Sequence, residues 1–303
     1  MRPRSTISSL LTASLAMAVL AGPSCSTGGR KARPEAGQGS EAEGSASGLT
    51  AIRIPGAGPI LDLSAPEWGQ AAPVAVTMIP QIMTTPRHPN AAIKQLRVKA
   101  VHNGQWVAVL IEWQDSTHSD RVDIDRFGDQ VAVEFPVGNQ DSAMPSPMMG
   151  NPGARVNILQ WRAAFQRDLD HGELTLHDLY PNAVVDLYPD RILRATDARP
   201  YTGALGLDNP VSRPNLSPVL EQMAEGWGTL TVTPEQDADG RGAWDDGTWR
   251  VVITAPMASG SANAPRLAPG QKTAVAFAVW DGGNREVGAR KAWSNWVPLT
   301  LSQ

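Results

Sequence analysis

The strongest pattern along the chain is a pair of apolar segments joined by a turn signal. Gln95–Val101 and Gln105–Trp113 flank the dipeptide Asn103-Gly104. Asn-Gly accepts the positive φ angles of a type I′ turn, so this arrangement predicts a β-hairpin. Apolar side chains occupy every second position of the second segment, and the residues between them are mostly apolar as well. We therefore expect both faces of the hairpin to be covered by other parts of the protein.

Further short apolar runs predict more strands, separated by Asp-Gly turn signals. The expected strands are Gln130–Phe135, Thr229–Thr233, Trp249–Thr254, Thr273–Trp280 and Trp296–Leu301. Many short strands with turn-rich connections favour a mainly β fold. We expect a two-sheet antiparallel β-sandwich of the immunoglobulin-like or carbohydrate-binding-module-like kind, with a few short helices.

Two segments bear on the helices of this fold. Pro218–Glu225 is predicted as a helix, because Ser217 can cap its first turn and Gly226 can end it. Ile158–Phe165 fits either a short strand or a helix, and its pattern leaves both open.

Composition narrows the possible functions. Only 18% of the residues are charged, the formal net charge is −4, and 42% are hydrophobic. This balance excludes a basic nucleic-acid binder and a disordered acidic protein. The single cysteine excludes an intramolecular disulfide, a Cys-rich metal or iron–sulfur site, and covalent haem attachment through two cysteines.

The first 49 residues predict export and a tether. Arg2 and Arg4 precede the apolar stretch Leu10–Ala21, and Gly22-Pro23-Ser24 then lead to Cys25, the only cysteine. Residues 1–25 are typical of a bacterial lipoprotein signal with Cys25 as the lipidated residue; ordinary signal cleavage is the alternative. Residues 26–49 have the composition of a flexible linker, which leaves one domain at residues 50–303. We expect a location in the periplasm or cell envelope.

The chain lacks the common motifs of catalytic sites. It has no Gly-x-Ser-x-Gly, Walker, His-Glu-x-x-His or dinucleotide fingerprint. His171 and His177 lie in an acidic stretch that could ligate a metal, although a solvated loop is the better interpretation. Met144, Met148 and Met149 lie in one loop. Their thioether groups could either ligate haem iron or fill gaps in the packing. Ten tryptophans could fill the core or line a haem or sugar site.

Several segments, in order, resemble one family. It comprises the haem b-binding gamma subunits of the molybdenum enzymes related to ethylbenzene dehydrogenase, dimethylsulfide dehydrogenase, selenate reductase and chlorate reductase, which form type II DMSO reductase-like complexes. The similar segments are Asn103–Thr117 with its Trp113-x-Asp115-x-Thr117, Asp129–Pro136, Pro147–Gly150, Val156–Trp161, Asp186–Pro189, Ala224–Gly226, Trp249–Val252, Leu267–Gly270 and Val275–Trp296 with its Trp280-Asp281-Gly282.

The resemblance implies one non-covalent haem b with a methionine and a lysine as axial ligands. By position these are Met149, with Met148 as the alternative, and Lys291, with Lys272 less favoured. Arg290 cannot substitute, because a guanidinium does not deprotonate in proteins.

The resemblance also implies a role and partners. The chain would be an electron-transfer subunit without catalytic residues of its own. Its partners would be a molybdopterin alpha subunit, an iron–sulfur beta subunit and a periplasmic cytochrome c or similar carrier, with the membrane reached through the lipid anchor. A longer loop at Asp168–Pro200 and the lipoprotein-like start depart from the smaller family members.

A second function fits the expected fold. A β-sandwich also occurs in carbohydrate-binding modules, and fold alone does not decide function. In that case exposed faces of Trp244 or Trp293 would stack on sugar rings, and Met149 and Lys291 would not be needed.

Overall fold

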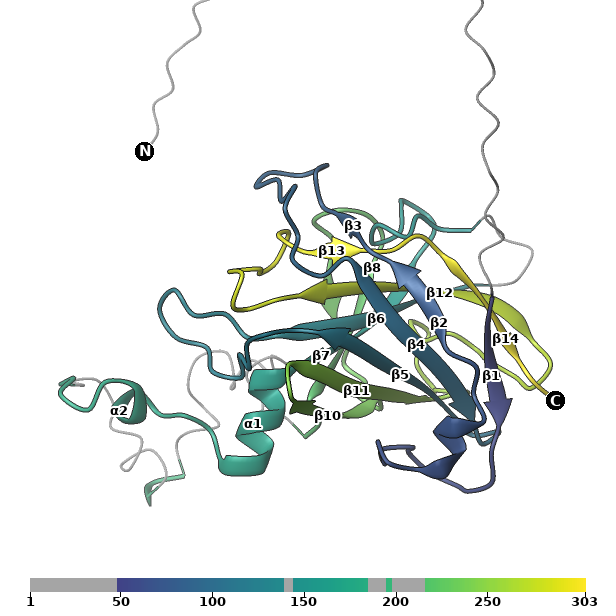
Figure 1. Ribbon diagram of the computed structural model, residues 1–303, viewed down its shortest axis with the longest axis horizontal. Coiled ribbons are helices and arrows are strands. Elements are labelled where there is room, and N and C mark those ends of the chain that lie inside the picture. The colour runs from purple at the N-terminus through teal and green to yellow at the C-terminus, as the bar shows by residue number, and fades with distance from the viewer. Residues whose placement is uncertain (1–47, 139–143, 185–194, 198–215) are drawn as a thin grey trace, which may run out of the picture. The chain divides into compact units, whose positions relative to one another are not determined.

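The computed structural model describes residues 48–138, 144–184, 195–197 and 216–303, and Figure 1 shows that strands are the main regular elements of this part of the chain. The strands are β1 (Leu49–Arg53), β2 (Val74–Thr77), β3 (Ile79–Pro80), β4 (Gln95–His102), β5 (Trp106–Gln114), β6 (Gln130–Pro136), β7 (Val156–Arg162), β8 (Val219–Ala224), β9 (Thr231–Val232), β10 (Asp239–Asp245), β11 (Thr248–Pro256), β12 (Lys272–Trp280), β13 (Ala292–Trp293) and β14 (Val297–Leu301). The helices are α1 (Ala163–His171), α2 (Leu176–Leu179) and a 3₁₀ turn at Pro66–Gly69.

The strands form two layers that share β12. The first half of β12 pairs with β14, and its second half pairs with β6. The first layer runs β10-β11-β5-β4-β1-β14, with β2 also on β4; the second runs β12-β6-β7-β8-β9, with β13 and β3 on the other side of β12. All pairings are antiparallel except those of β1, which is parallel to both β14 and β4. The expected β-sandwich is therefore confirmed.

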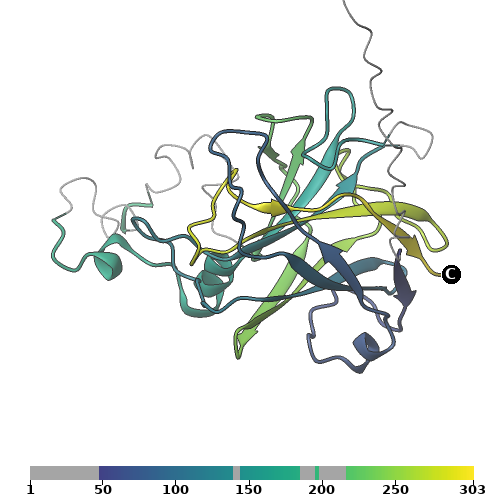
Figure 2. The same ribbon diagram turned by 45° about the horizontal axis from the view of Figure 1, so that its top comes forward.

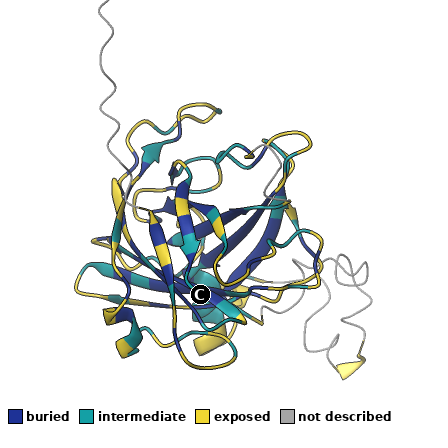
Figure 3. Ribbon diagram, turned by 90° about the vertical axis from the view of Figure 1, so that its right-hand side faces the viewer, coloured by how far each residue is buried: buried dark blue, intermediate teal, exposed yellow. Residues whose placement is uncertain are grey.

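The core lies between the two layers. Alternate residues of β5, such as Val109 and Ile111, pack in one buried cluster with Val133 of β6 and Trp161 of β7. The Trp161 ring meets Trp249 edge-on at 5.1 Å between centroids, a favourable aromatic geometry. Buried residues therefore gather in the central strands, and exposed residues gather in the loops (Figure 3).

The hairpin predicted around Asn103-Gly104 is present, but its turn differs. Strands β4 and β5 pair in register as far as His102 with Val107, and three residues connect them. Only Gly104 has a positive φ, of 86°. The Asn103 side-chain oxygen instead accepts hydrogen bonds from the backbone N–H groups of Gln105 and Trp106. The Asn side chain thus builds an Asx-type turn in place of the type I′ turn.

The helix predicted at Pro218–Glu225 is wrong, because Val219–Ala224 forms β8. All six residues of β8 pair with β7. Ser217 and Gly226 do bound the element, with Ser217 Oγ accepting from the Val219 N–H and Gly226 at φ 120°. Both faces of β8 are covered, so its sequence lacks the alternation that distinguishes a strand from a helix.

The ambiguous segment Ile158–Phe165 contains both elements. Strand β7 ends at Arg162 and helix α1 begins at Ala163. The strand predicted at Thr229–Thr233 is present only as the two residues of β9. Leu49, the last residue expected in the linker, is buried in β1. No described helix has the length and apolar character needed to cross a membrane.

The second layer places the candidate site. Its inner face packs on the core, and the outward-facing residues of β12, β6 and β7 alternate with the core residues. Loops before β7 and before β13 lie over this outer face, and Figure 2 shows these segments near the second layer.

Candidate functional site

A cavity of about 610 Å³ lies over the outer face of the second layer. Its floor consists mainly of small or apolar residues on three adjacent strands: Ala276 and Ala278 of β12, Ala132 of β6 and Ile158 of β7. Trp280 also lines it. Small side chains on a β-sheet face leave room above the sheet, and this volume lies within the range of roughly 300–1,000 Å³ of ligand sites.

The methionine loop forms one wall of the cavity through Met148 and Met149. This loop connects β6 and β7, and it ends in a tight turn closed by a hydrogen bond from the Gly150 N–H to the Ser146 carbonyl. The Met149 carbonyl accepts from the Gly226 N–H at 2.8 Å, and Trp296 Nε1 donates to the Pro145 carbonyl at 2.7 Å. The loop is therefore held from two sides.

Met149 adopts an unusual backbone conformation. Its φ is +69°, a region that costs a non-glycine residue free energy. Gly150 follows at φ +71°, and a Cβ there would lie 2.7 Å from the Ala154 carbonyl. The surrounding hydrogen bonds hold Met149 in this conformation, with its side chain packed beside Ile158 and Trp280. Strain that the surroundings enforce at one residue is typical of a functional position.

Lys291 lies in the segment just before β13. Ala292 pairs with Val279 of β12 and faces the core, so alternation turns Lys291 toward the cavity, which it lines. Its Nζ lies 5.0 Å from the centre of the Trp280 ring. The Gln81 N–H donates to the Lys291 carbonyl, and the Gln81 side chain donates to the Ala289 carbonyl at 3.0 Å. These bonds position the segment that carries Lys291.

The structure thus brings Met149 and Lys291 into one cavity. The Met149 loop leaves the second layer at the Pro136 end of β6, where Pro136 pairs with Val156. The Lys291 segment enters at the opposite end, where Trp280 pairs with Gln130. The two side chains therefore approach the same space from opposite ends of one strand.

Glu134 is a buried carboxyl in the same cavity that the sequence analysis did not single out. Its Oε1 atom has no hydrogen-bond partner among the described residues. Burial raises the pKa of Glu134 to about 8, although the Lys291 charge and the Met149 backbone N–H act in the opposite direction. Burial also lowers the pKa of Lys291, opposed by Glu134. Both groups therefore favour their uncharged forms more than they would in water.

A cluster of polar side chains also lines the cavity. It consists of Gln130, Gln160, Arg162 and Gln222. No sequence motif marks these residues, since they are isolated polar positions in otherwise apolar strands. A buried glutamine in a strand pattern is the only signal that could have indicated them.

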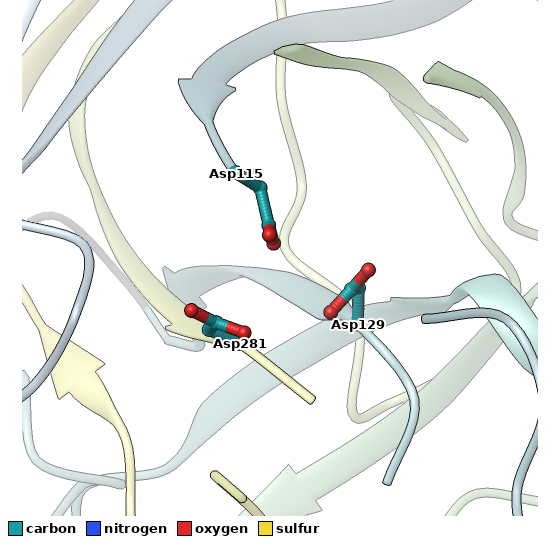
Figure 4. A group of neighbouring side chains, drawn as sticks. All are labelled: Asp115, Asp129 and Asp281. Carbon is teal, nitrogen blue, oxygen red and sulfur yellow. The ribbon is translucent and has the colours of Figure 1, made fainter. Parts of the chain in front are cut away.

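Three carboxylates meet at the end of the sandwich beside the core (Figure 4). Asp115, Asp129 and Asp281 each offer an oxygen, and these atoms lie within 4.8 Å of one another. Each aspartate comes from one of the family-like segments named above, so those motifs converge in space. Asp129 accepts hydrogen bonds from the N–H groups of Ser119 (2.7 Å) and Gly282 (2.8 Å) and from Trp249 Nε1 (3.0 Å). Asp129 thus joins three segments of the chain.

The pKa of Asp129 is raised to about 7, by burial first and then by the neighbouring charge of Asp115. The folded protein therefore keeps a proton on Asp129 that the unfolded chain releases near pH 4. We expect the stability of the protein to fall as pH rises from about 4 to about 7, by a few kcal/mol, and this contribution to be constant above pH 7.

Chemical denaturation of the parent and of Asp129→Asn at several pH values tests this. The variant cannot titrate at this position, so the difference in unfolding free energy between the two proteins should change between pH 4 and 7 and then level off. Two parallel stability profiles would show that Asp129 titrates normally.

The other candidate residues lie outside this cavity or outside the described part of the chain. His171 and His177 are exposed, and Asp178 accepts the Thr175 N–H in a capping box at the start of α2. They form no cluster of metal-ligating atoms within the described residues. Lys272 lies at the start of β12, away from the residues that line the cavity. Cys25 and the Asp186–Pro189 segment lie outside the described residues.

The tryptophans proposed for sugar stacking have other surroundings. Trp244 is half-buried, stacks on His118 at 5.4 Å and donates from Nε1 to the Asp115 carbonyl. Trp293 is half-buried and lines the cavity together with the more exposed Trp227. The Trp244 face is therefore occupied by a side chain, contrary to the expectation of an exposed ring.

Comparisons with known proteins identify the family of the chain. The family model described as Ethylbenzene dehydrogenase matches residues 65–292, which contain β2 to β12 and the first residue of β13. Because this match covers most of the chain, the protein belongs to the ethylbenzene dehydrogenase family.

Two relatives are named for their role in reductases. One, from Haloferax mediterranei, carries a name that describes it as heme subunit ORF7 of a respiratory nitrate reductase; it is 24% identical over 230 residues, 76% of this chain and 64% of its own length. The other is chlorate reductase subunit gamma of Ideonella dechloratans, 26% identical over 203 residues, 67% of this chain and 62% of its own length. The chain thus spans less than two thirds of each relative.

Two solved structures also align with the chain. They are complexes of a family 9 carbohydrate-binding module from Caldicellulosiruptor kristjanssonii, one with glucose and one with cellotriose. Their TM-scores are both 0.37, at 9% and 10% identity; each alignment covers 84% of this chain and 95% or 93% of the module.

Proposed function

We propose that the protein binds one haem b without covalent attachment, through Met149 and Lys291, and serves as an electron-transfer subunit. The observation that carries this proposal is that two residues far apart in the sequence, both nominated as ligands by the family resemblance, line one cavity. Met148 lines the same cavity and is the alternative ligand.

The residues of the cavity fit such a group. Its floor is mainly apolar, its volume is that of a cofactor site, and it offers a thioether sulfur and an amine, both of which are donors to haem iron. A lysine binds a metal only as the neutral amine. Burial of Lys291 lowers its pKa and so favours that form.

Other residues of this chain shape the cavity and position its ligands. Trp280 and the small residues of β12 and β6 exclude water from the cavity floor, and the strained Met149 backbone fixes the direction of its side chain. Glu134 holds its proton near neutral pH, which keeps a negative charge away from the same space. When bound, haem supplies one-electron redox chemistry, and the protein contributes ligands, a dry pocket and orientation.

The family and the relatives' names support a wider role. We propose a periplasmic subunit without catalytic residues that works beside a molybdopterin alpha subunit and an iron–sulfur beta subunit. Electrons would pass between the iron–sulfur clusters of the partner and a periplasmic cytochrome c or similar carrier. The predicted signal and Cys25 support an anchor in the cell envelope by lipidation.

The visible spectrum of the exported chain, produced with haem available, tests this proposal. We expect a Soret band, α and β bands that sharpen on reduction, and haem that acidified acetone extracts. A folded but colourless protein that takes up no added haem would overturn the cytochrome proposal. Binding of that colourless protein to glycans would then support a carbohydrate-binding module.

A further inference from the structure

The polar cluster occupies one part of the cavity floor. Gln130, Gln160, Arg162 and Gln222 come from the adjacent strands β6, β7 and β8, and all four line the cavity. Trp161, which lies between two of them in β7, faces the core. Alternation along the strands therefore directs these four side chains toward the cavity.

Hydrogen bonds within the cluster use its acceptors. Gln160 Oε1 accepts from Arg162 Nη2 at 2.9 Å and from Gln222 Nε2 at 2.8 Å. Gln160 Nε2 donates to Gln130 Oε1 at 2.6 Å. An amide oxygen has two lone pairs, so Gln160 Oε1 is saturated. Arg162 Nε is buried and has no partner among the described residues. This nitrogen still requires an acceptor.

The charge of Arg162 also lacks a counter-ion. Within the described part of the chain, no carboxylate forms an ion pair with Arg162, whereas nearby Arg167 and Arg241 pair with Asp168 and Asp170. A guanidinium remains protonated in proteins, and a buried charge without a partner is costly. The Phe165 ring, 4.9 Å from the guanidinium carbon, packs against Arg162 but offers no acceptor atom.

Glu134, the carboxyl in the same cavity, does not supply this counter-ion. It lies two positions beyond Ala132, which pairs with Gln160, toward the methionine loop. Among the described residues it forms no ion pair with Arg162, and its own Oε1 atom lacks a hydrogen-bond partner. The cavity is therefore lined by a positive charge without a counter-ion, which an anionic ligand group would neutralise.

We propose that Arg162, held by Gln160, binds a propionate carboxylate of the haem and so orients it in the cavity. This inference rests on the proposed haem binding. Haem carries two propionates as its only acidic groups, and its porphyrin edge otherwise offers no anion. The carboxylate would accept a charged hydrogen bond from the Arg162 guanidinium and supply its missing counter-ion.

Haem and its dimethyl ester, in which both carboxylates are blocked, provide the test. Each is titrated into the haem-free full chain and into Arg162→Gln, and the dissociation constants are measured by absorbance. The control is Arg241→Gln, because Arg241 pairs with Asp170 and does not line the cavity. We expect Arg162→Gln to weaken haem binding about tenfold to a hundredfold, the usual range for a lost charged hydrogen bond, and to leave binding of the ester unchanged.

The outcomes separate this inference from the proposed function. Equal losses for haem and ester would mean that Arg162 only supports the fold of the pocket, and no loss would mean that it does not contact the ligand; either overturns the inference while haem binding stands. A parent protein that binds neither ligand overturns both proposals. If Arg162→Gln does not fold, the parent alone still decides, because it should prefer haem over the ester by the same factor, and Arg162→Lys should retain part of that preference.

Discussion

Replacing Lys291 with alanine is expected to abolish the low-spin spectrum of the haem-loaded protein. The Lys291 amine reaches the cavity beside Trp280, and burial favours its neutral, ligating form. Loss of an axial ligand leaves a five-coordinate, high-spin iron. The affinity should fall by more than the roughly 10- to 100-fold that loss of an outer-shell partner costs a metal site. Absorbance and electron paramagnetic resonance of the reconstituted variant measure both effects.

Two control variants sharpen this test. Lys291→Arg keeps the positive charge and a long side chain, but its guanidinium has no lone pair for a metal, so it should behave like the alanine variant. Lys272→Ala removes the other candidate lysine, which pairs through its backbone with Thr300 outside the cavity, and should leave the spectrum unchanged. A low-spin spectrum that survives in Lys291→Ala would show that another group ligates the iron.

Replacing Met149 with alanine is expected to produce the second large effect, a lower reduction potential. A thioether ligand favours ferrous iron and raises the potential of a haem. Its loss should lower the potential by on the order of 0.1 V, a part of the roughly 0.8 V over which axial ligands tune haem proteins. Alanine keeps a Cβ at the positive φ of Met149, so it leaves the backbone strain of the loop in place. A spectroelectrochemical titration measures the shift.

Met148→Ala is the matched control for this variant. Met148 lies in the same turn and lines the same cavity, but it does not have the positive φ of its neighbour. We expect its replacement to change the potential little. If Met148→Ala shows the large drop and Met149→Ala does not, the ligand assignment moves to Met148. If neither variant changes the potential or the spectrum, the iron has no methionine ligand.

The strands that could be predicted from the sequence are those with a strong local pattern. β4, β5, β6, β11, β12 and β14 lie within two residues of their expected bounds, because β-branched and aromatic residues fill them and Gly-containing turns separate them. The segment that became β8 could not be predicted. Its residues Val219-Leu-Glu-Gln-Met-Ala suit a helix locally, and only the pairing with β7 makes them a strand.

Some residues of the candidate site could likewise be predicted from the sequence, and others could not. Met149, Met148 and Lys291 were nominated from the sequence by resemblance, and the structure brings all three to one cavity. Glu134 and Arg162 could not be nominated, because their significance lies in burial and in missing partners. Both properties depend on which strands lie side by side and on the loops above them. A polar residue in a strand pattern does not reveal whether it faces water or a cavity.

The sequence by itself determined the fold class, the family and the residue types available for iron ligation, since these depend on local pattern and on ordered motifs. The tertiary structure alone decided where those residues meet. Strand β12 belongs to both layers, and the outer face of the second layer forms the cavity floor. The loops that carry Met149 and Lys291 reach this face from opposite ends and line the cavity. Such contacts join residues more than a hundred positions apart, and their chemistry arises from burial, which only the folded chain creates.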